Sequence, residues 1–416
     1  MSFFLLLCVS FALIMHAADE SAAGEARIHG FFVQPSLGYG ATDFQSFSSQ
    51  GEYDSWVQSM ADVGAEMLFY QWTVHFEKGQ TWFSNQYGGS PDADFAFYNP
   101  APLTLNGIET RGWVTPTNWT GSPNQDGKEP VAYLLDAAQK AGIQVWLGLY
   151  LNEESSSLSW WDAVTDENFS AADQLIIEHH VLRSIAVVND LAAQHGSHPA
   201  LGGFYYSIEI ANNAFTPAAN HPYLASIIDR VAKAVHQALP GKKLAISPFF
   251  NTALDSAEQF GAMWEYVLKN SELDIIILQD GVGVEPHTLT KDNDQVSQYF
   301  RAVRKAANAA GKPLWGNVEL FTNLGDREDP QLIPASIDKI RLQLRTAAPH
   351  VDKFVCFEFH YMDPNDNYTF YKPLGGNAAA DSAMRQTLYD NYMLYWQNWQ
   401  EQAKNNSALP AILHLL

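Results

Sequence analysis

The sequence has 416 residues, 47% of them hydrophobic, which is enough for one large core or for two domains. Its 24 basic residues stand against 46 acidic ones, which gives a formal net charge of -22 at pH 7. A surface of this charge repels nucleic acids and anionic membranes, so we exclude both as partners and expect a monomer that acts on a neutral ligand.

The chain begins with a short apolar run. Residues 3–14 are FFLLLCVSFALI, and small residues follow near Ala17 and Ala18. The run is too short to span a bilayer, so we predict a signal peptide over residues 1–18 and a secreted or periplasmic protein. A membrane anchor is the alternative, because no Lys or Arg precedes the run. Cleavage would leave Cys356 as the only cysteine, so we expect no disulfide in the mature chain.

Eight apolar segments alternate with eight segments of helical periodicity. The expected strands are 28–37, 66–75, 143–154, 201–210, 243–251, 273–279, 313–323 and 353–361. The expected helices are 53–63, 131–141, 171–194, 222–238, 257–270, 296–310, 334–348 and 381–403. Strands that are each followed by a helix indicate parallel βαβ units. We therefore predict one α/β domain over residues 28–403, a (β/α)8 TIM barrel.

Two long connections are rich in aromatic residues. Residues 76–128 have no helical period, and a second aromatic loop carries Trp160 and Trp161. A loop as long as 76–128 inside a compact domain is usually functional. We expect it to line a cleft over the barrel. Trp72, Trp82, Trp160 and Trp161 fall at or beyond strand ends, where flat rings stack on sugars, although burial in the core is the default for Trp.

Every expected strand has an amide or a carboxylate near its end. These are Gln34, Gln71, Asn152, Glu209, Asn251, Gln279, Glu319 and Glu358. Alternate residues of a barrel strand face the axis, and the last inward residue lies at the catalytic face. The expected inward residues are Tyr205, Ser207 and Glu209 on the fourth strand, Trp315, Asn317 and Glu319 on the seventh, and Cys356, Glu358 and His360 on the eighth. Because buried polar groups need partners, this convergence predicts a polar ligand.

Glu209 and Glu319 have the arrangement that glycoside hydrolysis needs. Retaining hydrolysis uses two carboxyl groups about 5–5.5 Å apart, one as the nucleophile and one as the acid/base. Glutamates at the ends of the fourth and seventh strands lie on opposite sides of a barrel mouth, where a sugar ring fits between them. We expect nearby Asn and Gln side chains to lower the pKa of Glu319, and Glu358 to favour protonation of Glu209.

Several motifs carry a likeness to known enzymes. They are FVQP at 32–35, LFYQWT at 68–73, Glu209, LQDGVG at 278–283, Glu319 and FEF at 357–359. Over residues 28–400 the chain resembles the clan A glycoside hydrolases. It is more closely similar to an uncharacterised, mostly bacterial family of glycosidase-like barrels. The resemblance implies that Glu209 is the acid/base and Glu319 the nucleophile. Many clan A enzymes have Asn before the first Glu. This chain has Ile208, so Asn212 or Gln279 would have to hold the sugar 2-hydroxyl.

We predict further substrate-binding residues around this pair. They are Gln34, Gln71, Trp72, Asn152, Asn212, Gln279, Trp315, Glu358 and His360. Glu358 is also an alternative second carboxylate, and His360 is equally suited to a structural hydrogen bond. We interpret Asp280 as a turn residue, and Glu153 and Glu154 as solvated loop residues.

Two classes of function fit the pattern. One is a retaining β-glycosidase that acts on a neutral polysaccharide or oligosaccharide, with an inverting hydrolase that uses Glu358 as a variant of it. The other is a non-catalytic carbohydrate-binding barrel. The carboxylate pair favours the enzyme. The sequence has no HExxH motif, no cysteine-rich ligand set, no phosphate-binding glycine loop and no nucleophile elbow, so we expect neither metal nor nucleotide cofactors.

Overall fold

A computed structural model describes most of the chain. The described residues are 26–34, 49–77, 93–98, 128–153, 158–165, 167–284, 294–325, 331–365 and 378–413. The expected signal peptide, Trp82 and most of the 76–128 loop lie outside them. Within these ranges, no helix is both long and apolar enough to cross a membrane.

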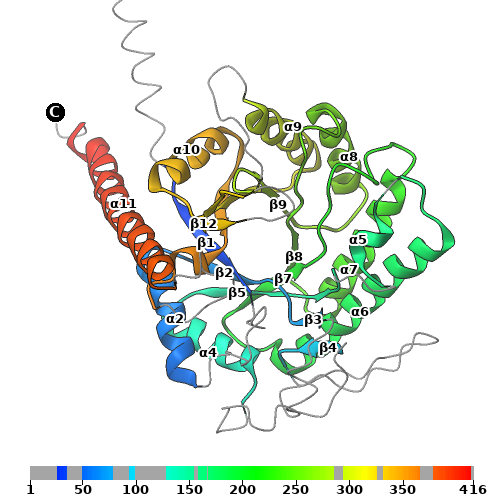
Figure 1. Ribbon diagram of the computed structural model, residues 1–416, viewed down its shortest axis with the longest axis horizontal. Coiled ribbons are helices and arrows are strands. Elements are labelled where there is room, and N and C mark those ends of the chain that lie inside the picture. The colour runs from blue at the N-terminus through cyan, green and yellow to red at the C-terminus, as the bar shows by residue number, and fades with distance from the viewer. Residues whose placement is uncertain are drawn as a thin grey trace, which may run out of the picture.

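Eight parallel strands close into a barrel (Figure 1). In order around the barrel they are β1 (Ile28–Val33), β2 (Met67–Tyr70), β5 (Gln144–Gly148), β7 (Leu201–Tyr206), β8 (Lys243–Ile246), β9 (Ile275–Gln279), β10 (Leu314–Glu319) and β13 (Lys353–Phe357). Each strand pairs in parallel with both neighbours, and β13 returns to β1. The (β/α)8 prediction is confirmed.

A helix follows each barrel strand and covers the outside of the barrel. The eight are α2 (Gln50–Asp62), α4 (Pro130–Ala141), α6 (Ala171–His195), α7 (His221–Ala238), α8 (Ala257–Lys269), α9 (Gln295–Ala310), α10 (Ile337–Ala347) and α11 (Ala378–Leu413). Local sequence explains several of the ends. Ser170 with Asp173 and Ser256 with Gln259 form capping boxes at the starts of α6 and α8. Gly142 ends α4 in the left-handed conformation, with φ of 74°.

Shorter elements decorate the end of the barrel at which the strands finish. β3 (Val74–Glu77), β4 (Ala93–Ala96) and β6 (Tyr150–Leu151) form a three-stranded sheet. β11 (Phe321–Asn323) pairs with β12 (Leu332–Pro334), and α5 (Trp160–Ala163) and η3 (Phe359–Met362) are single turns. A further single turn, η2 (Ala348–His350), lies between α10 and the start of β13, at the opposite end of the barrel. The expected strands extended several residues beyond the observed carboxyl ends of the barrel strands. The residues just beyond the barrel strands stay buried under loops, so their apolar pattern does not show where pairing stops.

Large side chains fill the interior of the barrel. Phe32 stacks on Phe69 with ring centroids 4.9 Å apart, and Phe69 and Trp146 both pack on Trp315. Trp315 therefore belongs to the packed core in the first half of β10, four residues before Glu319 and about 13 Å from it along the strand. This placement contradicts the expected substrate contact.

The inward face of β13 also differs from the prediction. Its register pairs Val355 with Asn317 and Phe357 with Glu319 on β10, and Val355 packs inside the barrel. Cys356 points the other way and belongs to the cluster between barrel and helices. The expected inward position of Cys356 is wrong, because a one-residue shift in register moves every side chain to the other face.

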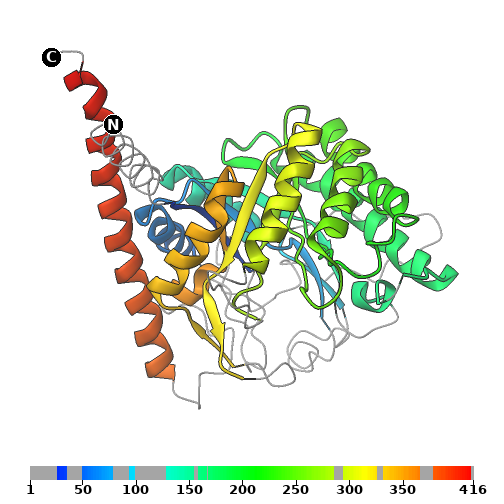
Figure 2. The same ribbon diagram turned by 90° about the horizontal axis from the view of Figure 1, so that it is seen from above.

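The last helix closes the fold beside its first strand. Figure 2 shows α11 along one side of the barrel, with its last turns extending beyond the other elements. The backbone N–H of Ile28 donates to the hydroxyl oxygen of Tyr392 at 2.9 Å, and the Tyr389 hydroxyl donates to the carbonyl of Ser59 at 2.9 Å. These contacts tie α11 to β1 and α2.

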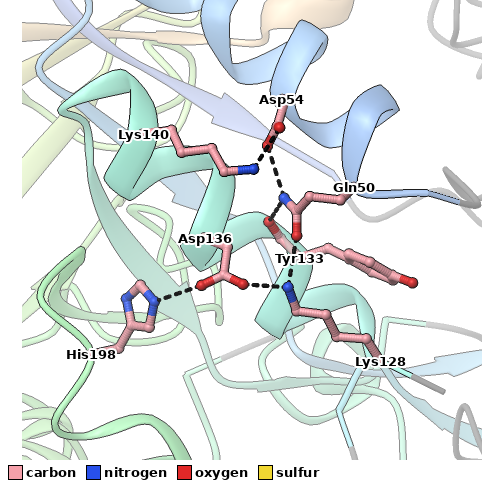
Figure 3. Close-up of polar contacts among 7 residues, drawn as sticks. All are labelled: Gln50, Asp54, Lys128, Tyr133, Asp136, Lys140 and His198. Carbon is pink, nitrogen blue, oxygen red and sulfur yellow. Dashed lines mark hydrogen bonds and ion pairs between the residues drawn. The ribbon is translucent and has the colours of Figure 1, made fainter. Parts of the chain in front are cut away.

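A polar network joins the first two helices of the barrel, α2 and α4 (Figure 3). Gln50 donates to Asp54 at 2.9 Å and to the carbonyl of Tyr133 at 3.0 Å. Lys128 donates to Gln50 at 2.7 Å and pairs with Asp136. Nζ of Lys140 on α4 lies 2.6 Å from Oδ2 of Asp54 on α2. Nε2 of His198 lies 3.1 Å from Oδ1 of Asp136. The helices are thus held together by charge-assisted hydrogen bonds as well as by packing.

Candidate active site

Three glutamates lie at the carboxyl end of the barrel. Glu319 is the last residue of β10, Glu358 follows β13 directly, and Glu209 stands three residues beyond the end of β7. Because all eight strands are parallel, these positions share one end of the barrel, the end at which TIM-barrel enzymes carry their active sites.

Backbone N–H groups of the loop after β9 bind the carboxylate of Glu319. The backbone N–H groups of Gly283 and Val284 both donate to Oε2 of Glu319, the latter at 3.1 Å. Asp280 accepts hydrogen bonds from the backbone N–H groups of Val282, at 3.2 Å, and of Glu319, at 3.4 Å. Asp280 is therefore a turn residue, as predicted, and it also supports the neighbouring strand.

The side chain of Gln343 on α10 binds both Asp280 and Glu319. Its side-chain N–H group donates to Oδ2 of Asp280 at 2.7 Å and to the carbonyl of Glu319 at 3.2 Å. Gln343 and Asp280 are almost completely buried. Sequence reasoning missed Gln343, because it lies in the middle of a helix and not at a strand end.

The environment of Glu319 raises its pKa to about 8. Burial is the main cause and the nearby charge of Asp280 is the second, while the N–H groups of Gly283 and Val284 and the charge of Lys339 act in the opposite direction. Burial likewise raises the pKa of Asp280 to about 6, despite its hydrogen bonds. The predicted lowering of the Glu319 pKa by amide side chains is therefore wrong.

Asn317 lies near Glu319 on β10, but none of the described hydrogen bonds joins its side chain to that carboxylate. Its Nδ2 group donates instead to Ser247 at 3.3 Å. Asn317 and Glu319 lie on the same face of β10 but two positions apart, and Asn317 is buried. The donors to Glu319 come from a neighbouring loop, whose path the sequence pattern does not specify.

Glu209 is held from two sides. Gln279, the last residue of β9, donates to its Oε1 at 3.2 Å, and the indole N–H of Trp160 donates to its backbone carbonyl at 2.7 Å. Burial raises the pKa of Glu209 to about 8, and the charge of Glu153 adds to this rise, while the hydrogen bond from Gln279 opposes it. The carboxylate whose charge raises the pKa of Glu209 is thus Glu153, and not the expected Glu358.

Glu153 is the second residue that sequence reasoning missed. It is only partly exposed, and its Oε1 accepts a hydrogen bond from the indole N–H of Trp161 at 3.1 Å. Glu153 is a loop residue, as expected, but it is only partly solvated and binds Trp161, and Glu154 lies outside the described residues. The sequence did contain one signal for Glu153, because it directly follows Asn152, which was expected at the end of the third strand.

Amide side chains at the ends of the first three barrel strands are buried. Gln34, Gln71 and Asn152 expose 7%, 8% and 0% of their surface. Among the described residues, neither side-chain atom of Asn152 nor Oε1 of Gln71 has a hydrogen-bond partner. Buried polar atoms without partners are costly, so these groups are suited to a polar ligand.

The eighth strand adds a close acid–base contact. Oε1 of Glu358 lies 2.7 Å from Nδ1 of His360, and both residues are buried at the start of η3. Trp72, at the end of the second strand, stacks on His75 with ring centroids 4.4 Å apart. Trp72 is buried, and its indole N–H has no partner in the described part of the chain.

Other predicted binding residues have structural contacts instead. Asn212 donates to the carbonyl of Asn251 at 2.8 Å and accepts from its N–H at 2.6 Å, so its amide joins the loops after β7 and β8. Trp160 is completely buried, whereas Trp161 keeps some exposed surface and packs edge-on against Phe249. Gln279 is the remaining candidate for the missing Asn, because it reaches Glu209.

No group of three His, Cys, Asp or Glu side chains within the described ranges has an arrangement that suits a metal ion.

Residues 28–368 match the family described as a domain of unknown function, DUF4434. The chain belongs to this family. No curated protein matches the sequence. A solved structure from Bacteroides thetaiotaomicron, to which α-L-fucosidase activity has been ascribed, has a TM-score of 0.59 and 19% sequence identity, and the match covers 90% of this chain and 94% of that one.

An endo-1,4-β-D-mannanase from Thermotoga petrophila has a TM-score of 0.49 and 15% identity, over 80% of this chain and 88% of that one. The first of these similarities shows a shared barrel fold. The family match agrees with the expectation of an uncharacterised family, and the structural similarity agrees with the expected barrel fold.

Proposed function

We propose that this protein is a secreted or periplasmic, monomeric retaining glycoside hydrolase that cleaves β-glycosidic bonds in a neutral polysaccharide or oligosaccharide. The observation that best supports the proposal is the pair of carboxyl groups with raised pKa values, the half-buried Glu209 and the buried Glu319, at the carboxyl ends of the fourth and seventh strands of one barrel. Buried carboxyl groups with raised pKa values are typical of catalytic sites.

The two glutamates have different surroundings, and these suit different roles. Glu319 has Oε2 held by two backbone N–H groups, an arrangement that orients a carboxylate for attack on the anomeric carbon. Glu209 accepts a hydrogen bond from only one side-chain donor among the described contacts, that of Gln279, so fewer donors stabilise its ionised form than stabilise that of Glu319. It is the better candidate for a group that has to carry a proton.

The reaction then follows two steps. Glu319 attacks the anomeric carbon while Glu209 gives its proton to the departing glycosidic oxygen, which leaves a glycosyl ester on Glu319. Glu209, now ionised, takes a proton from water as the water attacks the same carbon, and Glu319 is released. The buried amides of Gln71 and Asn152 would bind sugar hydroxyl groups during both steps.

Two tests separate the roles. Glu319→Ala should abolish turnover, and azide should restore it with inversion of the anomeric configuration. Glu209→Ala should keep activity on substrates with good leaving groups, and azide should then give a product of retained configuration. The anomeric configuration is followed by NMR after a screen on a polysaccharide panel. Glu258→Ala, an exposed glutamate in the first turn of α8, is the matched control and should behave as the wild type.

The alternatives predict other outcomes. Inversion by the wild-type protein would assign the second carboxylate to Glu358, which is buried at the same end of the barrel. An inverting pair needs about 6.5–9.5 Å between its carboxyl groups to admit a water molecule. Saturable binding of a polysaccharide without any turnover would instead indicate a carbohydrate-binding barrel.

A further inference from the structure

The single turn α5 connects two carboxylate-bearing loops through consecutive tryptophans. The indole N–H of Trp160 donates to the backbone carbonyl of Glu209 at 2.7 Å, and that of Trp161 donates to the side chain of Glu153 at 3.1 Å. One dipeptide thus holds both Glu209 and Glu153, although they belong to different strand ends.

This short turn is itself fixed to both loops. The backbone N–H of Trp160 donates to the carbonyl of Asn152 at 2.7 Å, and the hydroxyl of Ser159 donates to the carbonyl of Glu153 at 3.1 Å. On the other side, the amide of Asn213 donates to the carbonyl of Val164 at 3.0 Å. Because α5 is attached on both sides, the Glu153 carboxylate has a defined position relative to Glu209.

Glu153 is close enough to Glu209 for its charge to act on it. Burial is the first cause of the raised pKa of Glu209 and the charge of Glu153 is the second. The same two carboxylates also contribute to raising the pKa of Tyr205 on β7, after burial. The groups that face Glu209 are therefore Glu153, the neutral hydroxyl of Tyr205, and the uncharged amide of Gln279 on β9.

We propose that Glu153 is a positioning residue for the acid/base, which keeps Glu209 protonated through the repulsion between the two carboxylates while Trp161 holds it in place. This inference rests on the proposed role of Glu209. A negative charge nearby makes ionisation of Glu209 unfavourable until a leaving group takes the proton. Glu153 does not touch the reacting atoms in this scheme, and its effect is on the protonation of its neighbour.

The first test is the pH profile of Glu153→Gln. Loss of the charge should lower the pKa of Glu209, so the basic limb of kcat/KM should move to lower pH by about one unit, the usual scale for a neighbouring charge. Above that limb, activity on a substrate with a poor leaving group should fall about tenfold, since one pH unit changes the protonated fraction tenfold. A substrate with a good leaving group needs little acid assistance, so its glycosylation step should change little.

Matched variants control for other effects. Glu153→Asp keeps the charge and should leave the limb close to its wild-type position. Asp162→Asn removes the same charge from an exposed position on α5 and should leave the profile unchanged. Trp161→Phe keeps an aromatic ring but removes the indole N–H that donates to Glu153, and it should move the limb in the same direction as Glu153→Gln. An unmoved limb in folded Glu153→Gln, or an equal shift in Asp162→Asn, would overturn the proposal.

A second readout does not depend on turnover. NMR titration of isotope-labelled glutamate, with Glu209→Gln to assign the signal, measures the pKa of Glu209 directly in the wild type and in Glu153→Gln. A lower pKa in the variant supports the inference, and an unchanged pKa refutes it. A protein that hydrolyses no substrate but shows this shift would disprove the proposed function and leave the electrostatic coupling standing, so the two failures are distinguishable.

Discussion

Gly283→Ala should damage the active site while leaving the fold intact. A Cβ atom at this position would lie 2.7 Å from Oε2 of Glu319, 2.7 Å from Cε2 of Phe321 and 2.9 Å from Cβ of Glu319. These separations are shorter than van der Waals contact, so the glutamate has to move. The neighbouring Gly281 has a positive φ of 64°, whereas the constraint at Gly283 is the close approach of Glu319.

The size of the effect follows from that overlap. Restoring a contact of about 3.2 Å requires the carboxylate to shift by roughly 0.5 Å, and it weakens the hydrogen bond from the Gly283 N–H. A displacement of about 1 Å at a catalytic centre costs about a hundredfold in rate, so we expect kcat to fall roughly ten- to a hundredfold. Overpacking of this kind also costs about 1–3 kcal/mol of stability.

The assay is kcat on the substrate that the polysaccharide screen identifies, together with the urea midpoint. Gly51→Ala is the matched control, because a Cβ there meets nothing closer than 4.0 Å and the residue is exposed in α2. It should keep full activity and gain up to about 1 kcal/mol of stability from the better helix former. Full activity of folded Gly283→Ala would refute the view that the loop after β9 positions the nucleophile.

Three further predictions concern pH and stability. Both proposed catalytic carboxyl groups have pKa values of about 8, so kcat/KM should follow a bell-shaped curve with its maximum near pH 8. At that pH roughly a quarter of the molecules have Glu209 protonated and Glu319 ionised. A maximum below pH 6 would contradict this. Gly64→Ala should lower the free energy of unfolding by about 2–4 kcal/mol. The backbone φ of Gly64 is 86°, and a Cβ atom there would lie 2.5 Å from the ring of Trp396 on α11. An unchanged urea midpoint would count against this packing of α11. Asp136→Asn should cost up to about 1 kcal/mol near neutral pH. Partial burial is the largest single influence on the pKa of Asp136 and raises it, but Lys128 and His198 together outweigh burial and lower the pKa. The stability that they provide is present above the ordinary pKa and is lost as the pH falls through the lowered one, so the free energies of unfolding of wild type and variant should converge in acid.

The sequence by itself determined the architecture of this protein. Its alternation of apolar segments with amphipathic helices predicted eight strands and eight helices. All are present, although most strands end earlier than expected and the last helix extends to Leu413. It also placed Glu209, Glu319 and Glu358 at one end of the barrel. This was possible because parallel strands bring all their carboxyl ends to one face, whatever the details of the packing.

Only the tertiary structure decided which groups surround these glutamates. The tryptophans of α5 bind the carbonyl of Glu209 and the side chain of Glu153, and Gln343 binds Asp280 from a helix. These contacts depend on how loops and helices pack against the barrel. The facing of Cys356 and the core position of Trp315 likewise depend on register and depth in the barrel. A hydrophobic pattern records that a residue is buried, but it does not record against which neighbour. The pKa of a carboxyl group depends on those neighbours, and for this reason the expected low pKa of Glu319 was wrong.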